Sequence, residues 1–242
     1  MLMFAPSRDT LDKYSLQLSN VSAQLFKFMA NNLGVDLEVF LSTFKGLPQS
    51  VRINYYPPCS QADRVLGLSP HTDGVGMTFL LHVNDVEGLQ IRKDGKWFSV
   101  QAMHGALIVN IGDIIEVIWL NGYSICYRQK GCDYRVITLT CCNFGLHHIN
   151  HQPFNIIYLQ QILTNGRYKS VEHRAVINPN KERITIAAFH SIHLFCTIGP
   201  LQELLTADKA RYKVIDGVEF TKGYFAAKLE GRRYLESLKL GL

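Results

Sequence analysis

Short apolar segments recur along this chain from Val51 onward, and they leave few folds open. Each runs for four to eight residues and is bounded by proline, glycine or aspartate. Closely spaced segments of this length are typical of strands in a β-sandwich or jelly roll. The expected strands are 51–56, 76–82, 89–92, 97–100, 106–111, 170–176 and 183–190. We therefore predict a mainly β fold of the jelly-roll type.

Two of these strands form a predicted hairpin, and helices are expected on either side of the strand region. The hairpin runs through Asp94-Gly95, a strong turn signal. Before the strands, apolar residues recur in alternating steps of three and four, which predicts an amphipathic helix that Gly34 ends. They are Leu11, Tyr14, Leu18, Val21, Leu25 and Phe28. Asp36 then caps a short second helix, and a helical pattern over 224–238 is expected to lie against the barrel.

Composition excludes several classes of protein. With 47% hydrophobic and 19% charged residues over 242 positions, the chain is typical of a globular protein. Its formal charge of +5 comes from scattered residues, without the block of like charge that favours nucleic-acid binding. No run of eighteen apolar residues predicts a membrane span, and the first residues lack the features of a secretory signal. We therefore expect a cytoplasmic protein that binds neither nucleic acid nor membrane.

A histidine and an aspartate two residues apart mark the first candidate site. Strand side chains alternate between faces, so His71 and Asp73 are expected to leave the same face of a strand. His173 lies in a later expected strand. Two histidines and one carboxylate form the facial triad of Fe(II) oxygenases, which leaves coordination positions open. The His-x-Asp pair alone is weak support, because such pairs are more often surface or turn residues without a metal.

Four further residues could hold a ligand with a terminal carboxylate. Arg183 and Thr185 share one face of an expected strand, and a guanidinium beside a hydroxyl suits a carboxylate bound in bidentate fashion. Asn54 and Tyr56 offer an amide and a phenol that could reach the same ligand. The alternatives are an arginine at a solvated strand edge and a packed aromatic strand that ends at Pro57.

These residues and their neighbours resemble the plant 2-oxoglutarate/Fe(II)-dependent dioxygenase superfamily, in particular its branch of senescence-related-gene and codeine O-demethylase types. The resemblance covers roughly 11–240 apart from one segment. The segments that carry it are 54–59, 66–73, 88–90, 112–113, 165–174 and 182–184. It implies a double-stranded β-helix, a cupin-like jelly roll, with flanking α-helices.

The resemblance also implies roles and cofactors. The implied iron ligands are His71, Asp73 and His173, and the implied 2-oxoglutarate ligands are Arg183, Thr185, Asn54 and Tyr56. Fe(II) is the metal, 2-oxoglutarate and O2 are the cosubstrates, and ascorbate is a reductant. The implied reaction is hydroxylation, demethylation or desaturation of a small plant specialised metabolite by a monomeric enzyme.

The chain departs from the family pattern at three places. Thr185 stands where the family usually has serine, a change that keeps the hydroxyl and that we expect to be tolerated. His190 and Ser191 occupy the region of a substrate-facing aromatic residue. Family members also carry a longer N-terminal region. We therefore expect three parts, which are a helical remnant at 1–47, the barrel at 48–192 and a C-terminal tail and helix at 193–242.

Residues 117–161 match nothing in the family and interrupt the predicted barrel. His71 and His173 stand 102 positions apart, and 57 without these 45 residues, which is an ordinary separation for the family. Codons for Val117 and Gln161 can form the ends of an intron, so we interpret the segment as a translated retained intron that is extruded or disordered. A genuine added loop is the alternative. A zinc site is disfavoured, because the segment has no Cys-x-x-Cys pair.

Two competing functions remain open from the sequence. The first is a non-catalytic or unstable remnant that binds metal at most, which the missing N-terminal region and the insert favour. The second is a cupin-like isomerase with the same metal triad, which Arg183 and Thr185 disfavour. Transcript sequencing across the codons of Glu116 and Ile162 would show whether a spliced message restores the family pattern.

Overall fold

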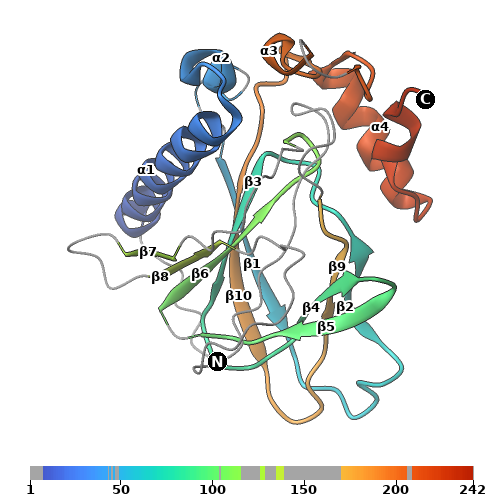
Figure 1. The fold of residues 1–242 in the computed structure, drawn as a ribbon. Helices are drawn as coiled ribbons and strands as arrows, with labels where there is room; N and C mark the ends of the chain where they lie inside the picture. The colour runs from blue at the N-terminus through green and yellow to red at the C-terminus, as the bar shows by residue number, and fades with distance from the viewer. Residues whose placement is uncertain are drawn as a thin grey trace, which may run out of the picture.

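Two β-sheets form the centre of the molecule, and helices lie along their upper end in Figure 1. The computed structural model describes residues 8–42, 44, 46, 49–103, 105–115, 126–128, 135–138, 170–205 and 209–241. One sheet has six strands in the order β1-β10-β3-β6-β8-β7, and the other has four in the order β2-β9-β4-β5. Apart from β6 and β8, neighbouring strands in both sheets are antiparallel. This arrangement confirms the predicted mainly β fold with flanking helices.

The elements have the following bounds. The strands are β1 (Gln49–Tyr56), β2 (Leu66–His71), β3 (Met77–His82), β4 (Leu89–Lys93), β5 (Lys96–Val100), β6 (Ala106–Ile111), β7 (Cys126–Arg128), β8 (Arg135–Thr138), β9 (His173–Val176), β10 (Arg183–His190), β11 (Thr197–Ile198) and β12 (Ile215–Asp216). The helices are α1 (Arg8–Leu33), α2 (Leu37–Ser42), α3 (Gln202–Leu205), α4 (Gly217–Leu229) and the 3₁₀ helix η1 (Tyr234–Leu238).

Strand β3 shows how the six-stranded sheet separates a core from a pocket. Met77 and Phe79 are fully buried in a cluster that includes the buried side chains of α1. Thr78 and Leu80 point to the opposite face, as alternation along a strand requires, and line the pocket between the two sheets. One face of this sheet therefore packs against the helices, and the opposite face lines the pocket.

The predicted first helix forms, with a shifted buried face. Leu18, Val21 and Leu25 are buried as expected, but Phe28 is 40% exposed and Phe26 is fully buried in its place. Phe26 stacks on Phe44, with ring centroids 4.5 Å apart. The periodicity predicted the helix correctly. It did not predict which phenylalanine is buried, because that depends on where α2 packs against α1.

The predicted helix ends and the predicted turn are confirmed. Gly34 ends α1 with a left-handed φ of 66°. The side chain of Asp36 caps α2, because its Oδ1 accepts hydrogen bonds from the backbone N–H groups of Glu38 and Val39 at 2.8 and 3.2 Å. Asp94 and Gly95 turn β4 into β5 with positive φ angles of 49° and 78°.

Two segments differ from the predicted elements. Strand β2 is not among the strands expected from the apolar segments. Pro70 lies inside it; the register of its pairing with β9 shifts twice, and such irregularity accommodates proline at a sheet position. The C-terminal pattern over 224–238 is not one helix. It divides into α4 and η1, and Gly231 between them has a φ of 67°.

Part of the segment 117–161 belongs to the large sheet, so the expectation that it is extruded is wrong for these residues. Strand β8 pairs in parallel with β6, and β7 pairs antiparallel with β8. The physical reason is that the free edge of β6 offers unpaired N–H and C=O groups, which a neighbouring strand satisfies. The other residues of the segment, including its ends at Val117 and Gln161, lie outside the described part of the chain.

Among the described helices, none combines the length and the apolar character that crossing a membrane requires.

Candidate metal centre

The two histidines of the predicted triad face each other across paired strands. His71 is the last residue of β2, His173 is the first residue of β9, and the two are direct partners in the antiparallel register. Their ring centroids are 4.3 Å apart. Residues 102 positions apart in the sequence are therefore brought together by strand pairing.

Asp73 completes the group, although by a different route from the one predicted. Strand β2 ends at His71, so Thr72 and Asp73 lie in the following turn and do not share a strand face with it. The turn brings the Asp73 Oδ1 atom to 3.6 Å from His71 Nε2 and 3.7 Å from His173 Nε2. The candidate ligand atoms of the three residues all lie within 4.8 Å of one another.

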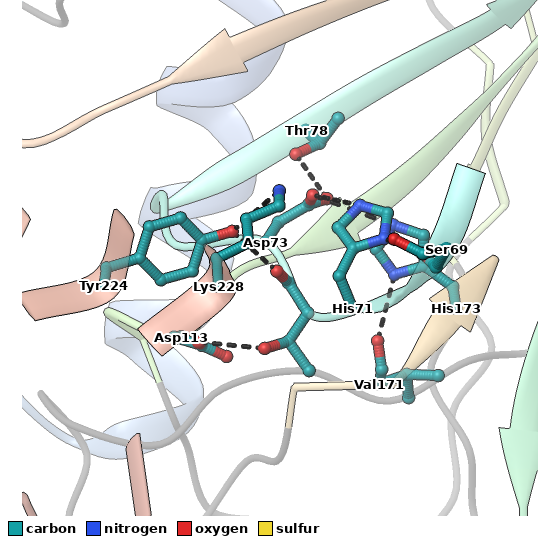
Figure 2. Close-up of polar contacts among 10 residues, drawn as sticks. Ser69, His71, Asp73, Thr78, Asp113, Val171, His173, Tyr224 and Lys228 are labelled. Atoms are coloured by element: carbon teal, nitrogen blue, oxygen red, sulfur yellow. Dashed lines mark hydrogen bonds and ion pairs between the residues drawn. The ribbon is translucent and has the colours of Figure 1, made fainter. Parts of the chain in front are cut away.

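Each of the three side chains is held in one orientation by a second group (Figure 2). His71 Nδ1 lies 2.8 Å from the carbonyl oxygen of Ser69, and His173 Nδ1 lies 3.0 Å from that of Val171. A carbonyl can only accept, so both Nδ1 atoms carry the proton and both Nε2 lone pairs are free. The Thr78 hydroxyl donates to Asp73 Oδ2 at 2.8 Å, while Oδ1 lies beside the two Nε2 atoms.

The electrostatics of the centre favour a neutral His71 and an ionised Asp73. Burial, and then the neighbouring charge of His173, lower the pKa of His71 to about 4. Burial alone would raise the pKa of Asp73, but the charges of His173 and His71 and the hydrogen bond from Thr78 lower it below its usual value. Two neutral imidazoles and one carboxylate are the protonation states that a divalent metal requires of its ligands.

A second turn, which the sequence did not assign a role, supports the ligand turn. The backbone N–H of Asp113 donates to the carbonyl of Asp73 at 2.6 Å, and the Thr72 hydroxyl donates to Asp113 Oδ2 at 3.0 Å. On the other side, the Tyr224 hydroxyl of α4 donates to the carbonyl of Thr72 at 2.8 Å. Burial raises the pKa of Asp113 to about 6. The Gly112-Asp113 pair after a buried strand was the only sequence signal for this support.

Substituting Gly112 with alanine is expected to disturb the centre. A Cβ at this position would lie 2.2 Å from the carbonyl oxygen of Val75 and 2.4 Å from that of Asp73, and neither backbone atom can move alone. We expect Gly112→Ala to destabilise the fold by about 2 kcal/mol and to weaken Fe(II) binding at least about tenfold. Denaturant unfolding and Fe(II) titration measure the two effects.

Gly241→Ala is the matched control, because a Cβ there meets nothing within 4 Å. If the Gly112 variant binds iron and unfolds as the control does, the second turn does not position Asp73.

The four residues predicted to hold a carboxylate gather on the paired strands β1 and β10. Tyr56 pairs with Arg183, and Asn54 pairs with Thr185, in one ladder. The Asn54 amide donates to the Thr185 hydroxyl at 3.2 Å, and the Arg183 guanidinium carbon lies 5.1 Å from the centre of the Tyr56 ring. All four line one pocket together with the three residues of the triad.

Arg183 is a buried cation, and no acidic side chain among the described residues forms an ion pair with it. It is 2% exposed, and its Nε forms no hydrogen bond with any of the described residues. Burial lowers its pKa, which interaction with Tyr56 partly opposes. A buried guanidinium with a free donor fits a carboxylate ligand in the pocket. The donor set of the triad, two imidazole nitrogens and one carboxylate oxygen, fits a non-haem Fe(II) ion in the same pocket.

Comparison with known proteins agrees with this chemistry. Residues 48–144 and 137–192 match the family model of the 2OG-Fe(II) oxygenase superfamily. 2-Oxoglutarate-dependent dioxygenase 11 of Oryza sativa subsp. japonica is 41% identical over 236 residues, which cover 98% of this chain and 54% of that protein. Codeine O-demethylase of Papaver somniferum is 34% identical over 237 residues, which cover 97% of this chain and 53% of that protein. The chain thus spans about half the length of these curated relatives.

A solved structure shares the fold. The crystal structure of JOX2 in complex with 2OG, Fe and JA superimposes with a TM-score of 0.70 at 30% sequence identity. The match covers 98% of this chain and 59% of that one.

Proposed function

This chain belongs to the 2OG-Fe(II) oxygenase superfamily, and we propose that it is a 2-oxoglutarate- and Fe(II)-dependent dioxygenase that oxidises a small molecule. The observation that carries the proposal is the shared pocket, in which the buried guanidinium of Arg183 faces the same space as His71, Asp73 and His173. A metal triad alone would also serve an isomerase. The unbalanced guanidinium adds a place for a dicarboxylate cosubstrate.

In this proposal the residues of the pocket have separate tasks. His71 and His173 would bind iron through Nε2, and Asp73 would bind it through Oδ1, while Thr78 holds the other carboxylate oxygen. When bound, iron, 2-oxoglutarate and O2 supply the oxidising power, with succinate and CO2 as products.

The far carboxylate of 2-oxoglutarate would lie at the ladder between β1 and β10. Arg183 would donate two parallel hydrogen bonds to it, and the Thr185 hydroxyl, held by Asn54, would donate a third. Tyr56 would flank the guanidinium and limit its movement. The extra methyl group of Thr185 is accommodated, because this residue is only 1% exposed and still bonds to Asn54.

The substrate is proposed to be a plant specialised metabolite, since relatives such as codeine O-demethylase carry that chemistry in their names. Four points stay predictions from the sequence. They are the cytoplasmic location, the monomeric state, the use of ascorbate, and the division of the chain into 1–47, 48–192 and 193–242.

Succinate formation from 2-oxoglutarate tests the proposed function without knowledge of the substrate. Many such reactions turn over slowly without substrate, so the purified chain, loaded with Fe(II) under air, is expected to form succinate above the level of iron in buffer. Titration of 2-oxoglutarate into the Fe(II)-loaded chain without oxygen tests binding separately. A chain that binds iron but neither binds nor consumes 2-oxoglutarate would be the non-catalytic remnant.

Deleting 117–161 is expected to raise the rate of succinate formation at least about tenfold. Ile115, just before the segment, is fully buried, and Ser170, beyond it, is buried and stabilises the Asp113 carboxylate by a hydrogen bond. Closing a loop of 45 residues costs only about 3 kcal/mol of entropy. However, the segment separates Ile115 from Ser170, and Ser170 bonds to Asp113, which in turn supports Asp73. If a metal ligand is displaced by about 1 Å, the reaction can slow on the order of 100-fold.

The comparison uses both chains at equal iron loading. Equal rates would show that the segment, with its strands β7 and β8, is a harmless addition to the sheet edge.

A further inference from the structure

His82 is a buried histidine at the end of β3, and the proposed function has given it no task. Only 5% of it is exposed, and neither of its ring nitrogens forms a hydrogen bond with any of the described residues. The histidines of the triad differ, because each bonds to a backbone carbonyl through Nδ1. A buried polar side chain without partners is costly, so its presence in a folded protein calls for an explanation.

The strand register places His82 beside the residues proposed to hold 2-oxoglutarate. His82 pairs directly with Thr185 of β10, and Thr185 pairs with Asn54 of β1, so the three residues form one row across the sheet. Thr78 and Leu80 precede His82 on β3 by four and two residues, and both line the pocket. Because side chains alternate along a strand, His82 lies on this same face of the sheet.

Arg183 is the diagonal neighbour of His82 on this face, because it lies two residues before Thr185 on β10. Diagonal neighbours in an antiparallel sheet stand about 7–8 Å apart, a distance that long side chains span. Burial, and then the charge of Arg183, lower the pKa of the His82 imidazole to about 4. His82 is therefore neutral at neutral pH, and one of its ring nitrogens keeps a lone pair that can accept a hydrogen bond.

Two other neighbours limit where the Arg183 side chain can move. The centre of the Tyr56 ring lies 5.1 Å from the guanidinium carbon. The backbone at Gly88 approaches so closely that a Cβ there would lie 2.8 Å from Arg183 Cδ and 3.1 Å from its Nε. These contacts leave the Nε–H of Arg183 without an acceptor among the described residues. A neutral His82 can supply one, because arginine can only donate whereas a neutral imidazole can also accept.

We propose that His82 is a positioning residue for Arg183: its imidazole accepts a hydrogen bond from the guanidinium, directly or through one bridging water, and so holds the guanidinium in the orientation that pairs with the far carboxylate of 2-oxoglutarate. This inference rests on the proposed function, because it concerns the same cosubstrate. His82 is not part of the pocket lining, so it acts through Arg183 and not on the cosubstrate itself. A polar group that is buried at a cost to stability is typical of a residue kept for function.

The test replaces His82 with leucine, which removes the acceptor and keeps an apolar side chain in the buried position. In the full chain loaded with Fe(II) and kept without oxygen, His82→Leu is expected to bind 2-oxoglutarate about tenfold more weakly, with unchanged iron affinity. Its denaturant midpoint is expected to stay the same or to rise, because an apolar group replaces an unpartnered polar one. A merely structural role predicts the reverse, which is a lower midpoint with unchanged 2-oxoglutarate affinity.

Three further variants complete the comparison. His82→Gln keeps an acceptor and is expected to bind 2-oxoglutarate within about twofold of the parent. His82→Phe keeps a ring without an acceptor, and it repeats the measurement if the leucine variant does not fold. His193→Leu is the matched control, since His193 is exposed and lies outside the pocket lining, and it should change neither affinity.

Combining the change at His82 with Arg183→Lys tests whether His82 acts through Arg183. In the Arg183→Lys background, His82→Leu is expected to cost less than about twofold in 2-oxoglutarate affinity, because the two residues act as one unit. The inference is overturned if the parent and His82→Leu bind 2-oxoglutarate equally, if His82→Gln is as weak as His82→Leu, or if the losses from the two sites multiply. A parent chain that binds iron but not 2-oxoglutarate would instead refute the proposed function, and this inference with it.

Discussion

Replacing His173 with alanine is expected to abolish Fe(II) binding and, with it, succinate formation. The substitution removes one of the three donor atoms that converge among the described residues, which are one aspartate oxygen and two imidazole nitrogens. The loss of a supporting group around a metal ligand already costs about 10- to 100-fold in affinity, so the loss of a ligand should exceed 100-fold. Metal content after desalting, and succinate yield at equal protein concentration, measure the two effects. His71→Ala is expected to behave in the same way.

His193→Ala is the matched control for these variants. His193 is exposed and lies outside the lining of the pocket, so its removal should change neither iron content nor rate. Circular dichroism establishes that each variant retains the fold. An unchanged iron stoichiometry in folded His71→Ala and His173→Ala proteins would remove the metal assignment.

Arg183→Lys is expected to weaken 2-oxoglutarate binding by about 2 to 3 kcal/mol, roughly 30- to 150-fold, while iron affinity stays the same. Lysine keeps the positive charge, but its single ammonium cannot donate two parallel hydrogen bonds to one carboxylate. The site is also closed: Arg183 is 2% exposed, so water cannot easily replace the lost donor. Anaerobic titration of 2-oxoglutarate into the Fe(II)-loaded protein provides the measurement.

Arg64→Lys, at an exposed position, serves as the control for the change of side chain. Equal affinity of the Arg183 variant and the parent for 2-oxoglutarate would mean that the carboxylate is held elsewhere in the pocket.

From the sequence we predicted three residues that the structure brings together, but not the contacts that hold them. His71, Asp73 and His173 could be proposed as ligands because metal ligands are restricted to a few residue types. The expected face-sharing of His71 and Asp73 was wrong, since the strand ends between them. Strand β2 was not among the expected apolar segments, and it contains Pro70, which a shifted register accommodates.

Contacts between distant segments had no local signal. The hydroxyl of Tyr224 meets a carbonyl 152 positions away, and nothing in the pattern of the C-terminal helix indicates that this one tyrosine points to the metal turn. Hydrophobic periodicity predicts which face of an element is buried, but it does not predict which element lies opposite.

The hydrogen bond from Tyr224 to Thr72 also has a consequence for the order of synthesis. A ribosome produces His71, Asp73 and His173 well before it produces α4, so the chain possesses every metal ligand before it possesses the group that pins the turn between two of them. Domains acquire structure progressively from the N-terminus during translation. A nascent or prematurely terminated chain that ends before α4 would thus display a looser turn at Thr72 and Asp73 than a chain that contains this helix.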